Sequence, residues 1–328
     1  MEVHHDAIRF REFLPASTPV VLTIGTFDGV HAGHRAVLEL LKKRAAQAGA
    51  ETVLLTFDPH PRMVLHPESH GLALLNTLEE KEALLSQTGL HHLVIQPFHS
   101  DLARMTPLEY IRQLIGEGIQ PKVVVVGYDH RFGRNREGDF AILTELGALF
   151  GFEVEELPAQ HVDDTRVSST KVRQALMAGD IADANHWLQS PYALTGRVVH
   201  GDQIGRTLGF PTANLGGIDA LKLIPGNGVY LAQASFAGTD VSHPALVNVG
   251  SRPTISRANG AGEPRVEAHL LGFQGDCYGQ TLTLAFTERI RDERKFPNRA
   301  ALLEAMQADL AWAEQRIFDR ATQQLPKT

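Results

Sequence analysis

The sequence is poor in cysteine, because its 328 residues include only Cys277. A single thiol cannot form an internal disulfide or a cysteine cluster for a metal ion, so a disulfide framework and a CxxC metal site are both excluded. One cysteine also fits a reducing compartment, and we expect a cytoplasmic protein. No apolar run approaches the roughly 18 residues of a membrane-spanning helix. The first residues, MEVHHDAIRF, lack the basic-then-apolar pattern of a signal peptide, and no membrane partner is expected.

Basic residues are fewer than acidic ones. Lysine and arginine number 31 against 38 aspartate and glutamate residues, which gives a formal net charge of −7. Nucleic acids select basic surfaces, so no nucleic-acid partner is expected. Two common phosphate-binding motifs are missing as well, since neither GxxxxGK[ST] nor a GxGxxG between a strand and a helix occurs. Any phosphate site must therefore be of another kind.

The first part of the chain alternates strand and helix patterns. Buried strands are predicted at 19–27, 51–57, 91–98, 122–129 and 152–158, with helical patterns between them. Such alternation is typical of parallel βαβ units, so we predict an α/β fold with a parallel sheet. Sheets of this kind bind ligands at the carboxyl ends of their strands.

The alternation of strands and helices ends at Pro191. Two short helices are predicted before this point, at 168–179 and 180–190. After it, strands follow without helices between them, at 192–199, 227–236, 244–250, 265–273 and 280–290. We predict a small β-barrel, closed by a helix from about 298 to 320. The expected domains are 1–188 and 189–328.

The stretch TIGTFDGVHAGH, residues 23–34, ends a strand and places His31 and His34 at a helix start. A helix N-terminus favours phosphate, and two imidazoles add hydrogen-bond donors. Gly25 and Gly29 let the backbone approach a ligand closely. A capped helix start with two surface histidines is the alternative, while zinc is disfavoured because no HExxH or cysteine cluster completes a site.

Three other polar segments follow strands or begin helices: TFDPHPR (56–62), VVGYDHRFGRNREGD (125–139) and RVSSTKVR (166–173). Taken alone, the segment 166–173 has the pattern of an ordinary Ser/Thr helix cap, and the segment 125–139 has that of a solvated loop. A parallel sheet would gather all of them on one edge, and this convergence favours an anion site.

The predicted barrel carries its own candidate site. Thr212 and Asn214 point the same way on an extended chain, and a hydroxyl and an amide oxygen suit Mg²⁺ carried by a nucleotide. Arg265, Glu267 and His269 share one face of an alternating strand. Either set can be merely solvated, but a kinase acting on an alcohol needs a base such as Glu267.

Together these motifs resemble a known family. GTFDGVHAGH with RVSSTKVR resembles the HxGH and ISSTxxR signatures of the nucleotidyltransferase superfamily, and GRTLGFPTANL resembles the riboflavin kinase signature. From about Pro19 to Asp309, the chain is similar to bacterial bifunctional riboflavin kinases/FMN adenylyltransferases. The family pattern usually has an aromatic residue where His130 stands, and an aspartate is common where Gly272 stands.

The resemblance implies two Mg²⁺-dependent activities: riboflavin and ATP give FMN, and FMN and ATP then give FAD and pyrophosphate. His31 and His34 would stabilise charge in the second reaction. Glu267 would be the base of the first, and Thr212 and Asn214 would hold the metal. Further ATP or flavin contacts would come from Gly25, Phe27, Asp28, Gly29, Phe57, Pro59, His60, Asp129, Arg131, Arg166, Ser169, Thr170, Arg173, Gly205, Arg206, Gly209, Arg291 and Arg294.

Two other functions remain open at this point. One is a single-step nucleotidyltransferase with an accessory β domain, against which the pair GRTLGFPTANL and RVEAHLL argues. The other is a flavin- or nucleotide-binding regulator without turnover, against which His31, His34 and Glu267 argue. For the enzyme we expect small-molecule partners, and a monomer or a weak homo-oligomer.

Overall fold

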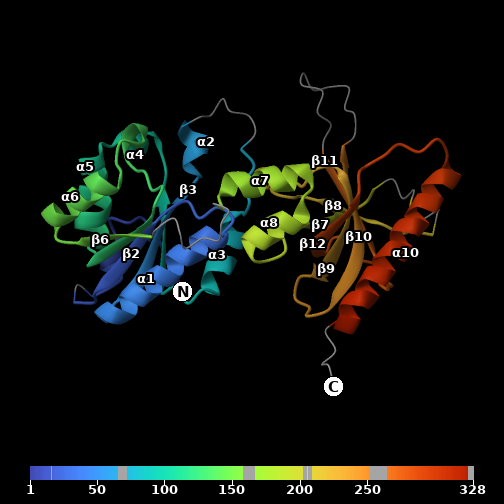
Figure 1. The fold of residues 1–328 in the computed structure, drawn as a ribbon, viewed down its shortest axis with the longest axis horizontal. Coiled ribbons are helices and arrows are strands. Elements are labelled where there is room, and N and C mark those ends of the chain that lie inside the picture. The colour runs from blue at the N-terminus through green and yellow to red at the C-terminus, as the bar shows by residue number, and fades with distance from the viewer. Residues whose placement is uncertain are drawn as a thin grey trace. The chain divides into compact units, whose positions relative to one another are not determined.

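The computed structural model describes residues 1–15, 17–65, 72–157, 167–201, 205, 209–251 and 264–323. The chain divides into two compact units, Met1–Ser169 and Thr170–Thr328. The first is an α/β unit and the second is built mainly of strands (Figure 1). This division falls before the two short helices that precede the barrel, whereas the sequence pattern placed the boundary after them, near Gln189. The boundary at Gln189 stays a prediction.

The first unit contains a six-stranded sheet in the order β1-β4-β3-β2-β5-β6, and every neighbouring pair is parallel. The predicted α/β class and the five predicted strands are confirmed. The short edge strand β1 was not predicted, because its residues EVHH show no apolar run. The strands are β1 (Glu2–His5), β2 (Val20–Ile24), β3 (Glu51–Asp58), β4 (His92–Pro97), β5 (Val123–Gly127) and β6 (Glu153–Leu157).

Helices connect these strands, and local signals set their ends. Helix α1 ends at Gly49, whose left-handed backbone (φ 57°) suits glycine. Thr77 and Glu80 form a capping box at the start of α3. The predicted helix 106–115 is α5, which continues into the π-helical stretch η2. The helices are η1 (Phe10–Glu12), α1 (Ala32–Ala48), α2 (Pro61–Leu65), α3 (Leu78–Ser86), α4 (Ser100–Arg104), α5 (Pro107–Tyr110), η2 (Ile111–Ile119), η3 (Arg134–Arg136) and α6 (Phe140–Phe150).

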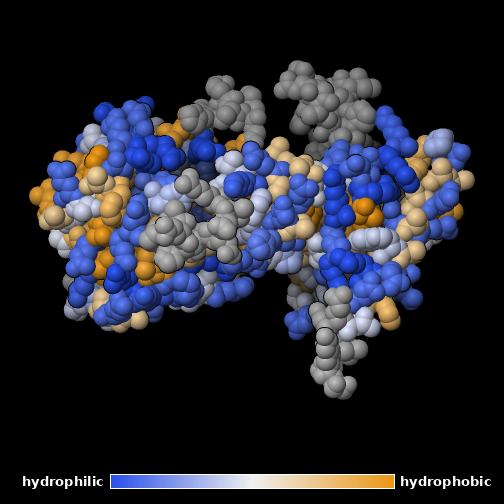
Figure 2. All heavy atoms as spheres, viewed as in Figure 1, coloured by the Kyte–Doolittle hydropathy of each residue, from blue (hydrophilic) through white to orange (hydrophobic). Residues whose placement is uncertain are grey.

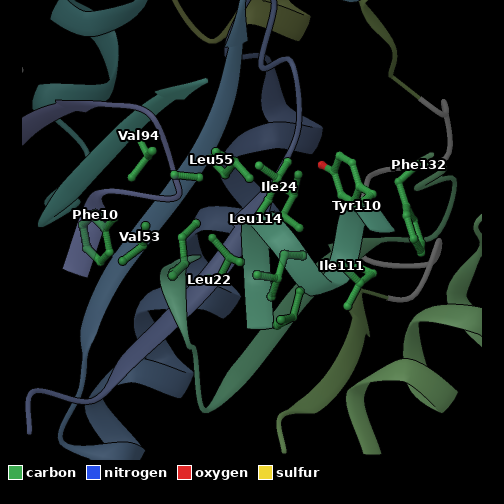
Figure 3. Close-up of a cluster of buried hydrophobic side chains, with 14 of the residues drawn as sticks. Phe10, Leu22, Ile24, Val53, Leu55, Val94, Tyr110, Ile111, Leu114 and Phe132 are labelled. Atoms are coloured by element: carbon green, nitrogen blue, oxygen red, sulfur yellow. The ribbon is translucent and has the colours of Figure 1, made fainter. Parts of the chain in front are cut away.

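Alternate residues of the buried strands point to opposite faces of the sheet, and a hydrophobic core covers each face. Leu22 and Ile24 pack with η2 and Tyr110 in one core (Figure 3). Val21 packs with Leu38 of α1 in the other core. Apolar contact on both faces fixes the strand register, so the strand ends that carry polar residues are held firmly at one edge.

The second unit is a closed barrel in the order β10-β11-β8-β7-β12-β9, and the predicted barrel is confirmed. Strand β8 was not predicted, because ANLG is too short to show a pattern. Helix α10 packs Ala313 against Leu231 and Leu246. The elements are α7 (Ser169–Ala178), α8 (Ile181–Leu188), β7 (Ala193–Val199), β8 (Ala213–Gly216), β9 (Gly228–Phe236), β10 (Ser242–Ser251), β11 (Pro264–Leu270), β12 (Thr281–Arg291) and α10 (Arg299–Gln323).

The visible surfaces of both units carry mainly hydrophilic residues, with scattered hydrophobic ones (Figure 2). Within the described ranges, no helix is both long enough and apolar enough to cross a membrane.

Candidate active sites

The turn between β2 and α1 builds the first site. All five residues of β2 are buried, and the chain then reverses through Phe27 and Val30, whose φ angles of 48° and 41° are left-handed. Non-glycine residues adopt this region at a cost, and such strain is concentrated at functional sites. The Phe27 ring stacks on His34 with centroids 4.6 Å apart, so the turn forms one wall of the histidine pair.

His31 caps α1 and is itself buried. Its Nδ1 accepts the His34 backbone N–H at 3.4 Å, so a neutral His31 ring carries its proton on Nε2. The His31 and His34 rings stack with centroids 3.7 Å apart and planes at 14°. A Cβ on Gly33 would come within 3.2 Å of the His31 ring, so glycine makes room for this packing. Two imidazoles therefore lie together where the α1 dipole is positive.

His34 carries a polar atom that a ligand can satisfy. Its Nδ1 is buried and has no hydrogen-bond partner within the part of the chain that the structure describes. Burial, and then the neighbouring His31 and Lys81, lower the pKa of His34 well below its usual value. The ring is therefore neutral near pH 7 and acts as a hydrogen-bond donor or acceptor rather than as a cation.

Lys81 of α3 supplies the charge that the histidines lack. Its side chain is 7% exposed; burial lowers its pKa, while the charges of Asp28 and Asp58 raise it. Lys81 was not predicted as a site residue, because LEEKEALL has the pattern of an ordinary charged helix. Only the packing of α3 beside the β2–α1 turn brings this ammonium to the histidines.

Asp28 organises the turn from within. Its Oδ1 accepts the backbone N–H groups of Leu75 at 2.9 Å and Asn76 at 3.3 Å, which fixes the chain leading into α3. The Ser169 hydroxyl donates to the Asp28 carbonyl at 2.9 Å. Asp28 therefore holds the surrounding segments together, and its expected contact with a ligand stays a prediction.

The end of β3 lies beside this turn. The Thr56 hydroxyl donates to the Thr26 carbonyl at 3.2 Å. The ring of Phe57 is buried against Phe98, while Pro59 is exposed. Since β2 and β3 are parallel neighbours, TFDPHPR lies at the same edge as the histidines, as predicted.

The structure does not test four other predicted contacts. Arg166 and Arg206 lie outside the described residues, and Thr170 and Arg173 belong to the second unit. Their roles stay predictions.

The loop after β5 is partly engaged with itself. Arg131 donates to Asp139 at 3.0 Å, and Asp139 also caps α6, while Asp129 is exposed. His130 stacks on Phe132, and its buried Nε2 has no partner among the described residues. Burial, and then Arg136, lower the pKa of His130 to about 4.

The barrel brings the second candidate site together around Glu267. Glu267 of β11 pairs in register with Asn214 of β8 on one side and Asn248 of β10 on the other. The Thr212 hydroxyl lies 3.5 Å from Glu267 Oε2. Thr212 and Asn214 are therefore neighbours of Glu267, which follows them by more than fifty residues in the sequence.

Arg265 holds this cluster in place. Its guanidinium donates to Asn214 Oδ1 from Nε (3.1 Å) and Nη2 (2.9 Å), and its Nε lies 2.6 Å from Glu267 Oε1. The strand alternates as predicted, since Val266 and Ala268 are buried and Arg265 and Glu267 are partly exposed. Arg265 was predicted on the same face as Glu267, but no role was predicted for it.

The cluster fits a magnesium ion by its chemistry, because it offers hydroxyl, amide and carboxylate oxygens, the hard ligands that Mg²⁺ prefers. The neighbouring glycines are spatially required. A Cβ on Gly201 would lie 2.2 Å from the Asn214 amide, and one on Gly205 would lie 2.3 Å from the Phe210 carbonyl. Gly209 has a φ of 82°, which also suits glycine.

The last residue of β12, Arg291, is anchored to α10. Arg291 donates through Nε and Nη2 to both carboxylate oxygens of Asp309, at 2.7–3.2 Å. Arg294 lies over the Phe296 ring, 4.9 Å from its centroid. The charge of Arg291 is thus already paired, and the predicted flavin contacts of both arginines stay predictions.

A buried histidine pair at a helix start on a parallel sheet, with an oxygen-rich cluster on a small barrel, is typical of a transferase that handles phosphate groups. Residues 14–171 match the FAD synthetase family model, and residues 188–317 match the riboflavin kinase model. The chain is 37% identical to the bifunctional riboflavin kinase/FMN adenylyltransferase of Pseudomonas fluorescens, over 91% of this chain and 93% of that protein. For the Escherichia coli (strain K12) protein of that name, identity is 36%, over 89% of each chain.

A solved structure described as a macrolide-efflux protein from Streptococcus pneumoniae is also similar, with a TM-score of 0.83 and 28% identity over 96% of this chain and 99% of that one. The chain belongs to the family of bifunctional riboflavin kinases/FMN adenylyltransferases. It is an enzyme of flavin cofactor synthesis, which uses ATP and Mg²⁺ to convert riboflavin to FMN and FMN to FAD.

Proposed function

We propose that the first unit forms FAD at the His31–His34 pair and that the barrel forms FMN at Glu267. The observation that carries the first assignment is the buried Nδ1 of His34, without a partner among the described residues, next to the His31 ring and under the influence of Lys81. A buried polar atom in this state is completed by a ligand, and donors beside an ammonium suit a phosphate oxygen.

In FAD formation, an oxygen of the FMN phosphate attacks the α-phosphorus of ATP. The new phosphorus–oxygen bond forms as the bond to the β-phosphate oxygen breaks, and pyrophosphate leaves with the electron pair. The FMN phosphate is largely ionised at neutral pH, with a second pKa of about 6, so it needs no protein base. His31, His34 and Lys81 would stabilise the charge that develops on the phosphate oxygens.

In FMN formation, Glu267 accepts the proton of the ribityl hydroxyl, whose oxygen attacks the γ-phosphorus of ATP while ADP leaves. Arg265, 2.6 Å from Glu267, would orient the carboxylate. Thr212 and Asn214 would hold the Mg²⁺, which neutralises phosphate charge when bound. For Asn214 to bind it, Arg265 must release or share the amide oxygen that it contacts.

The finer expectations extend this assignment. The catalytic domains would be 1–188 and 189–328, and the remaining ATP and flavin contacts would be those that the family motifs imply. We also propose a cytoplasmic enzyme, which the single cysteine supports, and no nucleic-acid partner, which the net charge of −7 supports. A monomer or a weak homo-oligomer is expected.

Product analysis tests the function. Purified protein is incubated with riboflavin, ATP and Mg²⁺, and the flavins are separated by chromatography. FMN appearing first and FAD second is the expected result. FMN alone would count against the histidine pair, and FAD from added FMN but no product from riboflavin would count against the barrel assignment. Bound flavin without turnover would favour the binding-protein alternative.

A further inference from the structure

A cluster of two histidines and a glutamate lies in the first unit, away from the residues discussed above. Glu2 and His4 stand on β1, and His92 begins β4. Glu2 and His92 are register partners on parallel strands, and His4 follows Glu2 by two residues, so all three side chains share one face of the sheet. The sheet topology, with β1 beside β4, thus joins residues that are about ninety positions apart.

Three potential ligand atoms converge at this place. His4 Nε2 lies 3.0 Å from His92 Nδ1, and Glu2 Oε2 lies 3.8 Å from the first and 3.7 Å from the second. Ligands around a tetrahedral zinc ion, bound at about 2.0–2.1 Å, are separated by roughly 3.3 Å. The observed separations lie on either side of this value, so shifts of a few tenths of an ångström would accommodate a metal ion.

Glu51 orients the His92 ring for metal binding. Its Oε2 lies 2.5 Å from His92 Nε2, the ring nitrogen that faces away from His4. A proton held on Nε2 by the carboxylate leaves the Nδ1 lone pair directed toward His4 and Glu2. Histidine ligands of metal ions commonly donate their second N–H to a carboxylate in this way, which fixes the tautomer and the ring orientation.

The surroundings make a partly open site. His4 and His92 side chains are 7% and 6% exposed, whereas Glu2 is 73% exposed. The Phe10 ring packs edge-on against His4, which holds the imidazole in place. Two fixed nitrogens and one accessible carboxylate leave a fourth position for water.

We infer that Glu2, His4 and His92 form a binding site for a divalent metal ion of the zinc class, with Glu51 orienting His92. Two imidazoles and one carboxylate are a ligand set that zinc accepts. The site joins the edge strand β1 to β4, so bound metal would stabilise the sheet edge.

This site is separate from FAD formation. Glu51 begins the eight-residue strand β3, and Asp58, whose charge acts on Lys81, ends it. At about 3.3 Å per residue, the two ends of that strand are roughly 23 Å apart. The role of the metal would therefore be structural, and catalysis should not depend on it.

Calorimetry with the full chain tests the inference. Chelator-treated protein is titrated with zinc chloride in excess Mg²⁺, which occupies sites for the nucleotide metal. We expect one zinc ion per chain and a higher melting temperature with zinc present. Glu2→Gln should weaken binding at least tenfold. Glu51→Gln should weaken it by about ten- to a hundredfold, because Glu51 would orient the His92 ring without binding the metal itself. Both side chains are more than a third exposed, so these variants should fold.

His92→Ala should abolish binding, and His5→Ala is the matched control, because His5 is the exposed neighbour of His4 on β1. His5→Ala should bind zinc as the parent does, and Glu2→Gln should keep both transferase activities. Absence of stoichiometric binding, or equal affinity in the parent, Glu2→Gln and Glu51→Gln, would overturn the inference. Equal zinc affinity in the three proteins would mean that zinc binds elsewhere and that His4 and His92 form only a hydrogen-bonded pair.

Discussion

His31 and His34 begin the same helix, but their surroundings differ. The His31 Nδ1 is used in capping α1, whereas the His34 Nδ1 is buried without a partner among the described residues. In the proposed FAD-forming site, Lys81 would supply positive charge and the neutral His34 ring would supply a directed hydrogen bond. This division of roles would explain how a site without a P-loop could hold a polyphosphate.

His34→Ala should lower FAD formation from FMN by about 10²–10³-fold, the usual effect of losing one donor to transition-state charge. Both reactions are followed in the same preparation by flavin chromatography. FMN formation from riboflavin should be unchanged, which also reports that the variant is folded. His99→Ala, which removes a histidine cap from α4, is the matched control and should alter neither rate. Loss of both activities in a folded His34→Ala protein would refute the two-site assignment.

His130 makes stability depend on pH. Its pKa is about 4 in the folded protein, because of burial and then Arg136, against an ordinary value of 6.5. Between these pH values the unfolded chain binds a proton that the folded protein does not, so stability falls as the pH is lowered through this window. His130→Phe removes this loss and the buried Nε2.

We therefore expect His130→Phe to lose less stability than the parent between pH 7 and pH 5, as measured by urea unfolding of the first unit. His5→Phe, a change at an exposed histidine, should keep the parent's pH dependence. An unchanged slope in His130→Phe would mean that His130 is not the group responsible.

Ion pairs join β12 to α10: Glu288 pairs with Arg316 and Arg320, and Arg291 at the end of β12 pairs with Asp309. Asp309 is 9% exposed and accepts hydrogen bonds from Arg291 at both carboxylate oxygens. Charge-assisted, two-point bonds of this kind are stronger than single surface pairs. The pair therefore helps to hold α10 on the barrel.

Asp309→Asn should lower the free energy of unfolding of the second unit by about 1–3 kcal/mol, since a charged hydrogen-bonded pair is broken. Both tryptophans, Trp187 and Trp312, belong to that unit, so their fluorescence follows its unfolding. Asp292→Asn is the matched control, because Asp292 pairs with Arg289 while 83% exposed. It should change stability by less than about 1 kcal/mol. Equal effects of the two substitutions would assign no special role to Arg291.

The two compact units of the chain carry one candidate site each. Glu267→Gln should abolish FMN formation, because the amide cannot take up the hydroxyl proton, and should leave FAD formation from added FMN intact. A mixture of Glu267→Gln and His34→Ala proteins should then make FAD from riboflavin, since FMN can pass through solution. Absence of FAD from the mixture, with each remaining activity present, would show that FMN is not exchanged between chains.

Much of the architecture could be predicted because its signals are local. Long apolar strands such as those at 51–57 and 122–129 and the capped helix after His31 are repeated patterns of neighbouring residues. Strands β1 and β8 could not be predicted, since four residues give no period and their pairing is set by distant partners. The π-helical stretch η2 was missed for a related reason, as its pattern continues that of α5.

The fold class and the family could be inferred from the sequence alone, and so could two candidate sites, because the motifs around His31, Thr212 and Glu267 are contiguous and ordered. The tertiary structure sets which distant residues contact one another. It brings Lys81 to His34, Arg265 to Asn214 and Glu267, and His4 to His92. These relations depend on sheet order and helix packing, which join residues far apart in the chain, and no local period encodes them.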